Sequence, residues 1–176
     1  MQQLAMRWTK KHLPVIALSQ SLPPGVVIRT YKEGDKEALK DALIPLTEVR
    51  YSDEKLDEVI LQRVGVRPEG IFLAEMNGEI VGTTTGYFNE DQTRGTLHMV
   101  SALSKAGGKG LGKILCQHAM DYLVNNGCNE IVLTTDDFRL AAIKTYLNLE
   151  FEPVISDKDM QARWDKVREN LRNRVE

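Results

Sequence analysis

The sequence lacks the features that mark several large classes of protein. It has two cysteines, Cys116 and Cys128, which are too few for a disulfide framework and show no zinc-site spacing. Its 23 basic and 25 acidic residues leave a net charge of -2, so no charge excess favours nucleic acid or an anionic membrane surface. The apolar run at residues 13–18 is interrupted by Pro14 and too short for a signal-peptide core or a membrane span. We therefore expect a cytoplasmic protein without a membrane or nucleic-acid partner.

Breaks in the apolar pattern divide the chain into three parts. Residues 1–25 have a loosely helical pattern that ends at Pro23-Pro24-Gly25, which predicts an N-terminal helical extension. Residues 26–155 form the main domain and are numerous enough to bury a sizeable core. Residues 156–176 predict a C-terminal helix packed on that domain, because a capping pattern at Ser156 precedes a stripe of apolar residues.

The main domain shows a regular alternation of strand-like and helix-like segments. The clearest signal is Asn77-Gly78 between two strand-like runs, since a type I′ hairpin turn needs two residues that tolerate positive φ. The complete prediction is a strand at 26–31, helices starting near Asp35 and Ser52, strands at 71–76, 79–88 and 96–103, a helix after residue 110, a strand at 130–135, a helix at 140–147 and a strand at 151–155.

The segment from residue 96 to residue 115, TLHMVSALSKAGGKGLGKIL, is the most informative stretch. An apolar run passes through a polar break into four glycines within six residues, and a helix follows. A strand that turns through glycines into a helix directs free backbone N–H groups and the positive end of the helix dipole at one point. This arrangement predicts an anion site, most naturally for phosphate.

The loop does not match either of two well-known phosphate-binding motifs. Gly107 to Lys113 has the spacing of a nucleotide-binding P-loop, but Ile114 stands where a Ser or Thr should hold magnesium. A dinucleotide-binding fingerprint needs Gly-x-Gly-x-x-Gly, whereas these glycines are spaced by two and Lys113 takes the last glycine's place.

The loop resembles the acetyl-CoA pyrophosphate loop of the GNAT superfamily of N-acyltransferases, Arg/Gln-x-x-Gly-x-Gly/Ala. Gly110 and Gly112 take the two glycine positions, and Gly107 replaces the Arg or Gln, which leaves a cradle made mostly of backbone. The resemblance implies that the pyrophosphate is held by Gly107, Gly108, Lys109, Gly110, Leu111, Gly112 and Lys113. It also implies that the preceding strand splays from the strand at 130–135, so that backbone groups of Val100, Ser101 and Ala102 can pair with pantetheine.

A second stretch, RLAAIKTYLNLEF at residues 139–151, is similar to the GNAT pattern Asn-x-x-Ala-x-x-x-Tyr-x-x-x-Gly-Phe. Arg139 replaces the Asn and Glu150 replaces the Gly, while the matching residues are Ala142, Tyr146 and Phe151. By this resemblance Tyr146 is the general acid that protonates the departing thiolate; the alternative is an ordinary half-buried aromatic. Arg139 either pairs with a CoA phosphate or is a surface charge.

An amine acceptor also requires a route for its proton. A primary alkylamine with a pKa of about 10.4 needs about 4.6 kcal/mol to reach its neutral form at pH 7. His98 is the candidate base, because arylalkylamine acetyltransferases of this superfamily place a histidine at the same distance before the glycines; a core or surface histidine, with a water chain as the base, is the alternative. Strand alternation predicts His98, Val100 and Ala102 on one face. His12 and His118 show no ligand spacing, so we predict no metal.

The resemblance as a whole implies an α/β protein with the GNAT fold, a mixed and mostly antiparallel sheet flanked by helices, here with additional terminal helices. It implies transfer of an acetyl group from acetyl-CoA to a primary amine of an unidentified small-molecule or peptide acceptor, by direct attack. The alternative is a non-catalytic acyl-CoA-binding or protein-interaction module on the same fold, and a P-loop phosphotransferase is a distant third. Dimers are common in the family, so a homodimer is the candidate oligomeric state, which the sequence does not decide.

Overall fold

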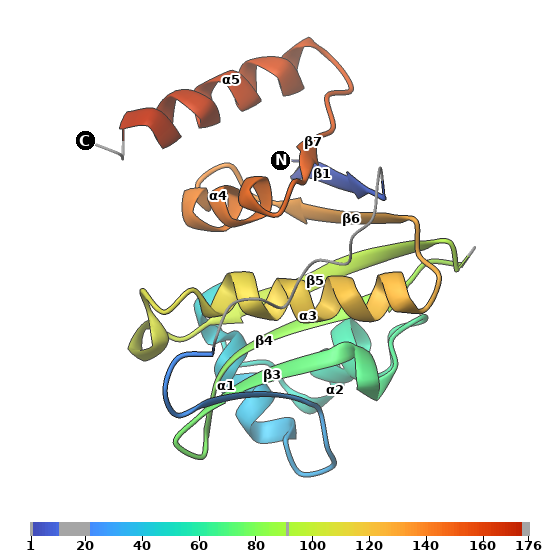
Figure 1. The fold of residues 1–176 in the computed structure, drawn as a ribbon, viewed down its shortest axis with the longest axis vertical. Helices are drawn as coiled ribbons and strands as arrows, with labels where there is room; N and C mark the ends of the chain where they lie inside the picture. Colours follow the sequence, from blue (N-terminus) through green and yellow to red (C-terminus); the bar gives the residue numbers. More distant parts are fainter. Residues whose placement is uncertain (1, 11–21, 91, 174–176) are drawn as a thin grey trace.

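A single open sheet of seven strands organises the part of the chain that the structure describes (Figure 1). The computed structural model describes residues 2–10, 22–90 and 92–173. The strand order is β2-β3-β4-β5-β6-β1-β7, and every neighbouring pair is antiparallel except β5 and β6. The strands are β1 (Leu4–Thr9), β2 (Val26–Thr30), β3 (Ile71–Met76), β4 (Glu79–Phe88), β5 (Arg94–Ala102), β6 (Glu130–Thr135) and β7 (Glu152–Pro153).

Helices cover both faces of this sheet (Figure 1). The helices are α1 (Lys36–Thr47), α2 (Asp53–Leu56) with a π-helical turn at Asp57–Leu61, α3 (Leu111–Asn125), α4 (Leu140–Asn148) and α5 (Lys158–Asn173), and short 3₁₀ turns lie at Pro68–Gly70 and Ser104–Ala106. The larger core joins α3, α4 and α5 to one face of the sheet, whereas α1 and α2 pack on the other face around Leu39, Leu56 and Leu73. The mixed sheet with helical layers confirms the predicted fold class.

The hairpin between β3 and β4 and the position of α3 both depend on small residues. Asn77 and Gly78 have φ values of 53° and 85°, which confirms the predicted two-residue turn. At Gly86 an added Cβ would lie 3.2 Å from the backbone oxygen of Ala119, so the strand has no room for a side chain under α3. This close contact fixes α3, and with it the glycine loop at its start, against the middle of the sheet.

The N-terminal segment corrects one prediction. Residues 4–9 form strand β1 rather than a helix, and all six pair with β6, from Leu4 opposite Thr135 to Thr9 opposite Glu130. The physical reason is a period of two: Leu4 and Met6 are fully buried, whereas Arg7 is exposed. Residues 11–21 of the predicted helical extension lie outside the described residues.

The C-terminal part follows the prediction with two differences. The last predicted strand shrinks to Glu152–Pro153, which pairs with β1. Helix α5 is capped by Asp157, whose Oδ1 accepts the backbone N–H of Met160 at 2.9 Å, rather than by Ser156. Its buried residues, Met160, Trp164 and Val167, belong to the larger core.

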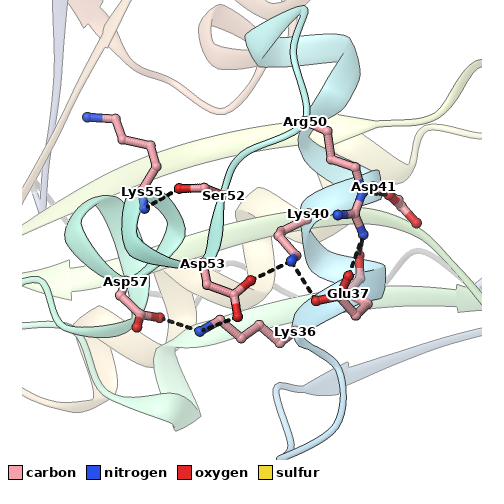
Figure 2. Close-up of polar contacts among 9 residues, drawn as sticks. All are labelled: Lys36, Glu37, Lys40, Asp41, Arg50, Ser52, Asp53, Lys55 and Asp57. Carbon is pink, nitrogen blue, oxygen red and sulfur yellow. Dashed lines mark hydrogen bonds and ion pairs between the residues drawn. The ribbon is translucent and has the colours of Figure 1, made fainter.

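Ion pairs fix α2 and the π-helical turn against α1 (Figure 2). Lys40 is buried, and its Nζ lies 2.5 Å from both Asp53 Oδ1 and Glu37 Oε1. The neighbouring Lys36 Nζ lies 2.9 Å from Asp57 Oδ1, at the start of the π-helical turn. Only the Lys40 side chain is buried, whereas the carboxylates of Glu37 and Asp53 are more than half exposed. The network therefore orients the segment that leads to Val59 and Arg63 rather than forming a fully buried ion pair.

Candidate active site

The candidate site is a groove where β5 and β6 separate. The two strands pair only from Arg94 to Thr96 on β5 and from Glu130 to Val132 on β6, and beyond this they diverge (Figure 1). This divergence confirms the predicted splay. It opens a groove of about 780 Å³ that is lined by β5, β6, β1, α4 and the α1–α2 side of the molecule.

A second, smaller cavity adjoins the groove. It measures about 290 Å³ and reaches Ala102 at the end of β5 and Gly112 at the start of α3. The two cavities share five lining residues, which are Leu46, Val100, Arg139, Ala142 and Tyr146. The site is therefore a path with two ends, one at the glycine loop and one beside β1, that meet at Tyr146.

The glycine loop has the geometry of an anion cradle. Gly108 and Gly110 adopt positive φ values of 73° and 69°, which L side chains rarely allow. Within the part of the chain that the structure describes, the backbone N–H groups of residues 108–112 donate no hydrogen bond. An added Cβ at Gly112 would meet nothing within 4 Å, so this side of the loop is open. Unsatisfied N–H groups at a helix N-terminus fit a phosphate group.

A β-bulge changes the faces of β5. Thr83 pairs with Ser101 and Thr85 with His98, so Met99 and Val100 together oppose the single residue Thr84, and Met99 has a φ of 54°. The predicted alternation of His98, Val100 and Ala102 on one face is therefore wrong. Val100 packs against the larger core, whereas Met99 packs against the smaller one beneath α1 and α2.

Ser101 contributes only its backbone to the path. Its Oγ donates a hydrogen bond of 2.6 Å to the backbone oxygen of Ala42 in α1, and the side chain is buried. The hydroxyl therefore ties β5 to α1. Val100, Ser101 and Ala102 all line the smaller cavity.

His98 is a neutral imidazole held in a defined tautomer. Its Nε2 lies 3.2 Å from the backbone oxygen of Val59. A carbonyl oxygen only accepts, so Nε2 carries the hydrogen and Nδ1 is the free acceptor. Burial, with a smaller contribution from the nearby Arg63 guanidinium, lowers the pKa of His98 to about 4. The ring of Tyr87 packs edge-on against it, with the ring centroids 5.7 Å apart.

Tyr146 lies at the junction of the two cavities and keeps its proton. Its side chain, on α4, is 6% exposed, and burial raises the pKa of the hydroxyl far above its ordinary value. The neighbouring Cys116 is fully buried, and burial raises its thiol pKa to about 12, so it is no nucleophile. A protonated hydroxyl at this place can donate a proton.

The substitution at Glu150 leaves the end of α4 intact. Glu150 has a φ of 65°, the left-handed conformation that glycine adopts most readily. The backbone N–H of Phe151 still donates to the oxygen of Tyr146 at 3.0 Å, and the Phe151 ring packs against the Tyr146 ring with centroids 6.1 Å apart. The helix end therefore holds Tyr146 in place despite the missing glycine.

Arg139 bridges the two walls where the cavities meet. Its Nε donates to Asp136 Oδ2 at 3.1 Å, and its Nη2 donates to the backbone oxygen of Leu46 at 2.7 Å. Asp136 lies just beyond β6, and Leu46 lies near the end of α1. A phosphate that approached Arg139 would therefore compete with these two acceptors.

Comparison with known proteins agrees with this geometry. Residues 36–151, more than half of the chain, match the model of the acetyltransferase (GNAT) family. The chain belongs to the GNAT family. This membership confirms the family resemblance found in the glycine loop and around Tyr146.

The relatives of this GNAT chain have several acetyltransferase names. It is 27% identical over 161 residues to the mycothiol acetyltransferase of Frankia alni, covering 81% of this chain and 47% of that protein. The chain thus spans about half the length of the mycothiol acetyltransferases that it matches. Among solved structures, a GCN5-related N-acetyltransferase from Sphaerobacter thermophilus gives a TM-score of 0.69 at 22% identity, covering 86% of this chain and 48% of that one. Arabidopsis thaliana Naa50 in complex with the bisubstrate analogue CoA-Ac-MVNAL gives 0.60 at 27% identity, covering 76% of this chain and 85% of that one.

The sequence analysis missed several groove residues of this GNAT chain. Arg63 and Tyr87 come from different segments, yet Nη2 of Arg63 donates to the Tyr87 hydroxyl at 3.1 Å. On the opposite wall, β1 brings Gln3 and Arg7 to the groove, and Gln3 Nε2 donates to Asp136 Oδ1 at 3.1 Å. A period-two reading of residues 4–9 would have placed Arg7 on the face opposite the core.

Neither a metal centre nor a membrane span was found in the described ranges. Residues 2–10, 22–90 and 92–173 contain no group of three or more His, Cys, Asp and Glu side chains that could hold a metal ion. Among the helices of these same ranges, none combines the length and the apolar character that crossing a bilayer requires.

Proposed function

We propose that this GNAT chain transfers an acetyl group from acetyl-CoA to a primary amine by direct attack. The observation that carries the proposal is the path of two cavities that meet at Tyr146, with an open glycine loop at one end and a separate groove at the other. Two substrates can enter such a path from opposite ends. Family membership supports the same reaction.

The glycine-loop end suits acetyl-CoA. The N–H groups of residues 108–112 would hold the pyrophosphate, with the positive end of α3 behind them and the ammonium groups of Lys109 and Lys113 beside them. The backbone of Val100, Ser101 and Ala102, released from β6 by the splay, would pair with pantetheine. When bound, acetyl-CoA supplies the acetyl group as an activated thioester.

The groove end suits the amine. The amine nitrogen attacks the carbonyl carbon, so a C–N bond forms and the C–S bond breaks without a covalent enzyme intermediate. Tyr146 donates its hydroxyl proton to the departing sulfur as the C–S bond breaks. Burial raises the pKa of this hydroxyl, so the group is protonated before the reaction, and the phenolate regains a proton from solvent afterwards. Backbone N–H groups of the bulged end of β5 would polarise the carbonyl.

The amine's proton leaves through the groove. Nδ1 of His98 is an unprotonated acceptor at neutral pH, because the pKa of this imidazole lies near 4. A base of this pKa is weak, so we propose that His98 takes the proton or orients a water chain that carries it to solvent. Under either route, the pH dependence of the rate above pH 5 follows the acceptor amine.

The experiment that tests the function measures binding first and transfer second. Acetyl-CoA at about a thousand times its dissociation constant should stabilise the protein by about 4 kcal/mol, or about 8 to 16 °C in unfolding midpoint. Release of free CoA thiol is then followed with a panel of amines. A shift with magnesium-ATP and none with acetyl-CoA would contradict the proposal.

A non-catalytic acyl-CoA-binding or protein-interaction module is the second candidate. The observation that favours it is the Arg139 bridge, which replaces the family's Asn and spans the junction between the two cavities. Binding of acetyl-CoA without transfer to any amine of a broad panel would support this candidate. The division of the chain at residues 25 and 155, a cytoplasmic location and a homodimer stay predictions.

A further inference from the structure

The outer end of the groove contains a guanidinium group that is fixed but not paired. Arg63 lines both the groove and an open outer pocket of about 1100 Å³. Its Cζ lies 4.8 Å from the centre of the Tyr87 ring, and its Nη2 donates to the Tyr87 hydroxyl. Among the described residues it has no carboxylate partner within ion-pair distance. Stacking thus orients the group, and most of its donors are left for a ligand.

The other charged groups that the structure describes in the groove are already balanced. Glu130 faces Arg7, with 3.9 Å between Oε2 and Nη1, and Asp136 accepts from Arg139 at 3.1 Å. His98 is neutral at physiological pH. The surplus charge of the groove is therefore the positive charge of Arg63, at the end of the path away from the glycine loop.

The outer pocket limits what this charge can bind. Its wall carries Glu54, Asp57, Glu58 and Glu90 together with Arg63 and Arg94. Asp57 is paired with Lys36 and Glu58 with Lys55, each at 2.9 Å, but all four remain carboxylates that repel an extended polyanion. One compact anionic group next to the groove fits this arrangement best.

We propose that Arg63 determines acceptor specificity by binding a carboxylate of the acceptor, so that the preferred substrates are amines that carry one carboxylate, of amino-acid type. The inference rests on the proposed acetyl transfer and names its substrate class. The amine end lies toward Tyr146, and the carboxylate receives a charge-assisted, forked hydrogen bond from the guanidinium. Arg63 acts on the choice of acceptor and takes no part in bond making.

The structure offers a matched control in the same segment. The Cζ of Arg67 lies 4.9 Å from the centre of the Phe88 ring, the same kind of stacking, but Arg67 lines neither the groove nor the outer pocket. Arg63→Met and Arg67→Met therefore remove the same group from similar surroundings. Arg63→Lys keeps the charge and loses the fork, so it should give an intermediate result.

The experiment compares acceptors that differ only in the carboxylate. The compounds 4-aminobutyrate and 6-aminohexanoate are each tested against their carboxamides, whose amines have similar pKa values, and α-amino acids are tested against their amides at equal concentrations of neutral amine. We expect kcat/KM to favour the carboxylates, and Arg63→Met to reduce that preference about ten- to a hundredfold, as expected for hydrogen bonds to a charged group. Arg67→Met should leave the preference unchanged.

Three results would separate the outcomes. Acetylation of amines without any preference for carboxylates, or with a preference that survives Arg63→Met, overturns this inference and leaves the proposed function standing. If no amine is acetylated, the proposed function fails, and calorimetry of the same carboxylates with CoA-loaded protein decides the role of Arg63. Binding that Arg63→Met abolishes and Arg67→Met retains would support the inference, and binding that is equal in all variants, or absent in the wild type, would overturn it.

Discussion

The two ends of the candidate site are built by different means. At the glycine-loop end, consecutive backbone N–H groups of residues 108–112 and the bulged end of β5 form the surface, and few side chains matter. At the groove end, where we propose that the acceptor binds, side chains from β1, the turn at Arg63, β4, β5 and β6 meet. A backbone cradle is encoded within one stretch of sequence, whereas a side-chain groove depends on which distant segments the fold brings together. Substitutions in the groove can therefore change which acceptor binds there, while the backbone cradle still binds the same ligand.

Tyr146 lies where the two ends meet, so its removal gives the largest expected effect. Tyr146→Phe deletes the proposed proton donor and keeps the ring that packs on Phe151. Loss of a general acid typically costs about a hundredfold or more in rate, so turnover should fall about a hundredfold while acetyl-CoA affinity stays nearly intact. Steady-state kinetics with the best acceptor of the panel measures both quantities.

The control for this substitution is Tyr122→Phe. Tyr122, on α3, packs against Phe72 and lines neither the groove nor the smaller cavity. The turnover of the Tyr122→Phe variant should therefore match that of the wild type. Unchanged turnover in Tyr146→Phe would remove the general-acid assignment and leave only the packing role of the tyrosine.

The same contrast explains how far the sequence could predict the structure. The turn at Asn77-Gly78, the glycine loop and the helix that follows it are local patterns, in which neighbouring residues have to share one backbone conformation. The interpretation of Tyr146 as a site residue also depended on a local pattern and its register. These elements lie where the sequence placed them, because each is determined within about ten residues.

The acceptor end could not be predicted in this way. Residues 4–9 are too few to separate a period of two from a helical period, and their partner β6 follows more than a hundred residues later. The bulge at Met99 depends on the pairing of β4 with β5, so alternation alone placed His98 and Val100 on the same face. Arg63 and Tyr87 meet because the π-helical turn that precedes Arg63 lies beside β5, where the backbone oxygen of Val59 contacts His98. Such contacts are tertiary, and no pattern along one segment encodes them.

The second largest expected effect concerns His98, a groove residue whose lowered pKa makes the free energy of unfolding depend on pH. Its pKa is about 4 in the folded protein against 6.5 in the unfolded chain, so between these values the unfolded state binds more protons. The contribution of neutral His98 to the free energy of unfolding is fully present above about pH 6.5 and is lost as the pH falls toward 4. The expected loss between pH 7.5 and pH 5 is about 2 kcal/mol.

The measurement is urea unfolding of the wild type and of His98→Gln at both pH values. His118, whose pKa burial lowers, and Asp121, whose pKa burial raises to about 6, also respond to acid, but they are present in both proteins. The difference between the two pH dependences therefore reports His98. If the variant loses as much stability as the wild type on acidification, the imidazole is not held neutral in the groove.

Substitutions at Gly112 test the glycine-loop end of the site. They should weaken the binding of acetyl-CoA and leave the choice of acceptor unchanged. An added Cβ at this position meets no atom within 4 Å, so Gly112→Val should fold normally, and its side chain would project into the space that the loop leaves open. We expect acetyl-CoA binding to weaken about fivefold to tenfold, with Gly112→Ala in between, because a larger side chain keeps the phosphate farther from the N–H groups. The preference among acceptors should stay the same in both variants, since the acceptor end shares no residue with the loop. Calorimetric titration with acetyl-CoA measures the first quantity and competition between acceptor pairs measures the second. A changed acceptor preference in Gly112→Val would mean that the two ends are coupled and that the backbone cradle also shapes the groove.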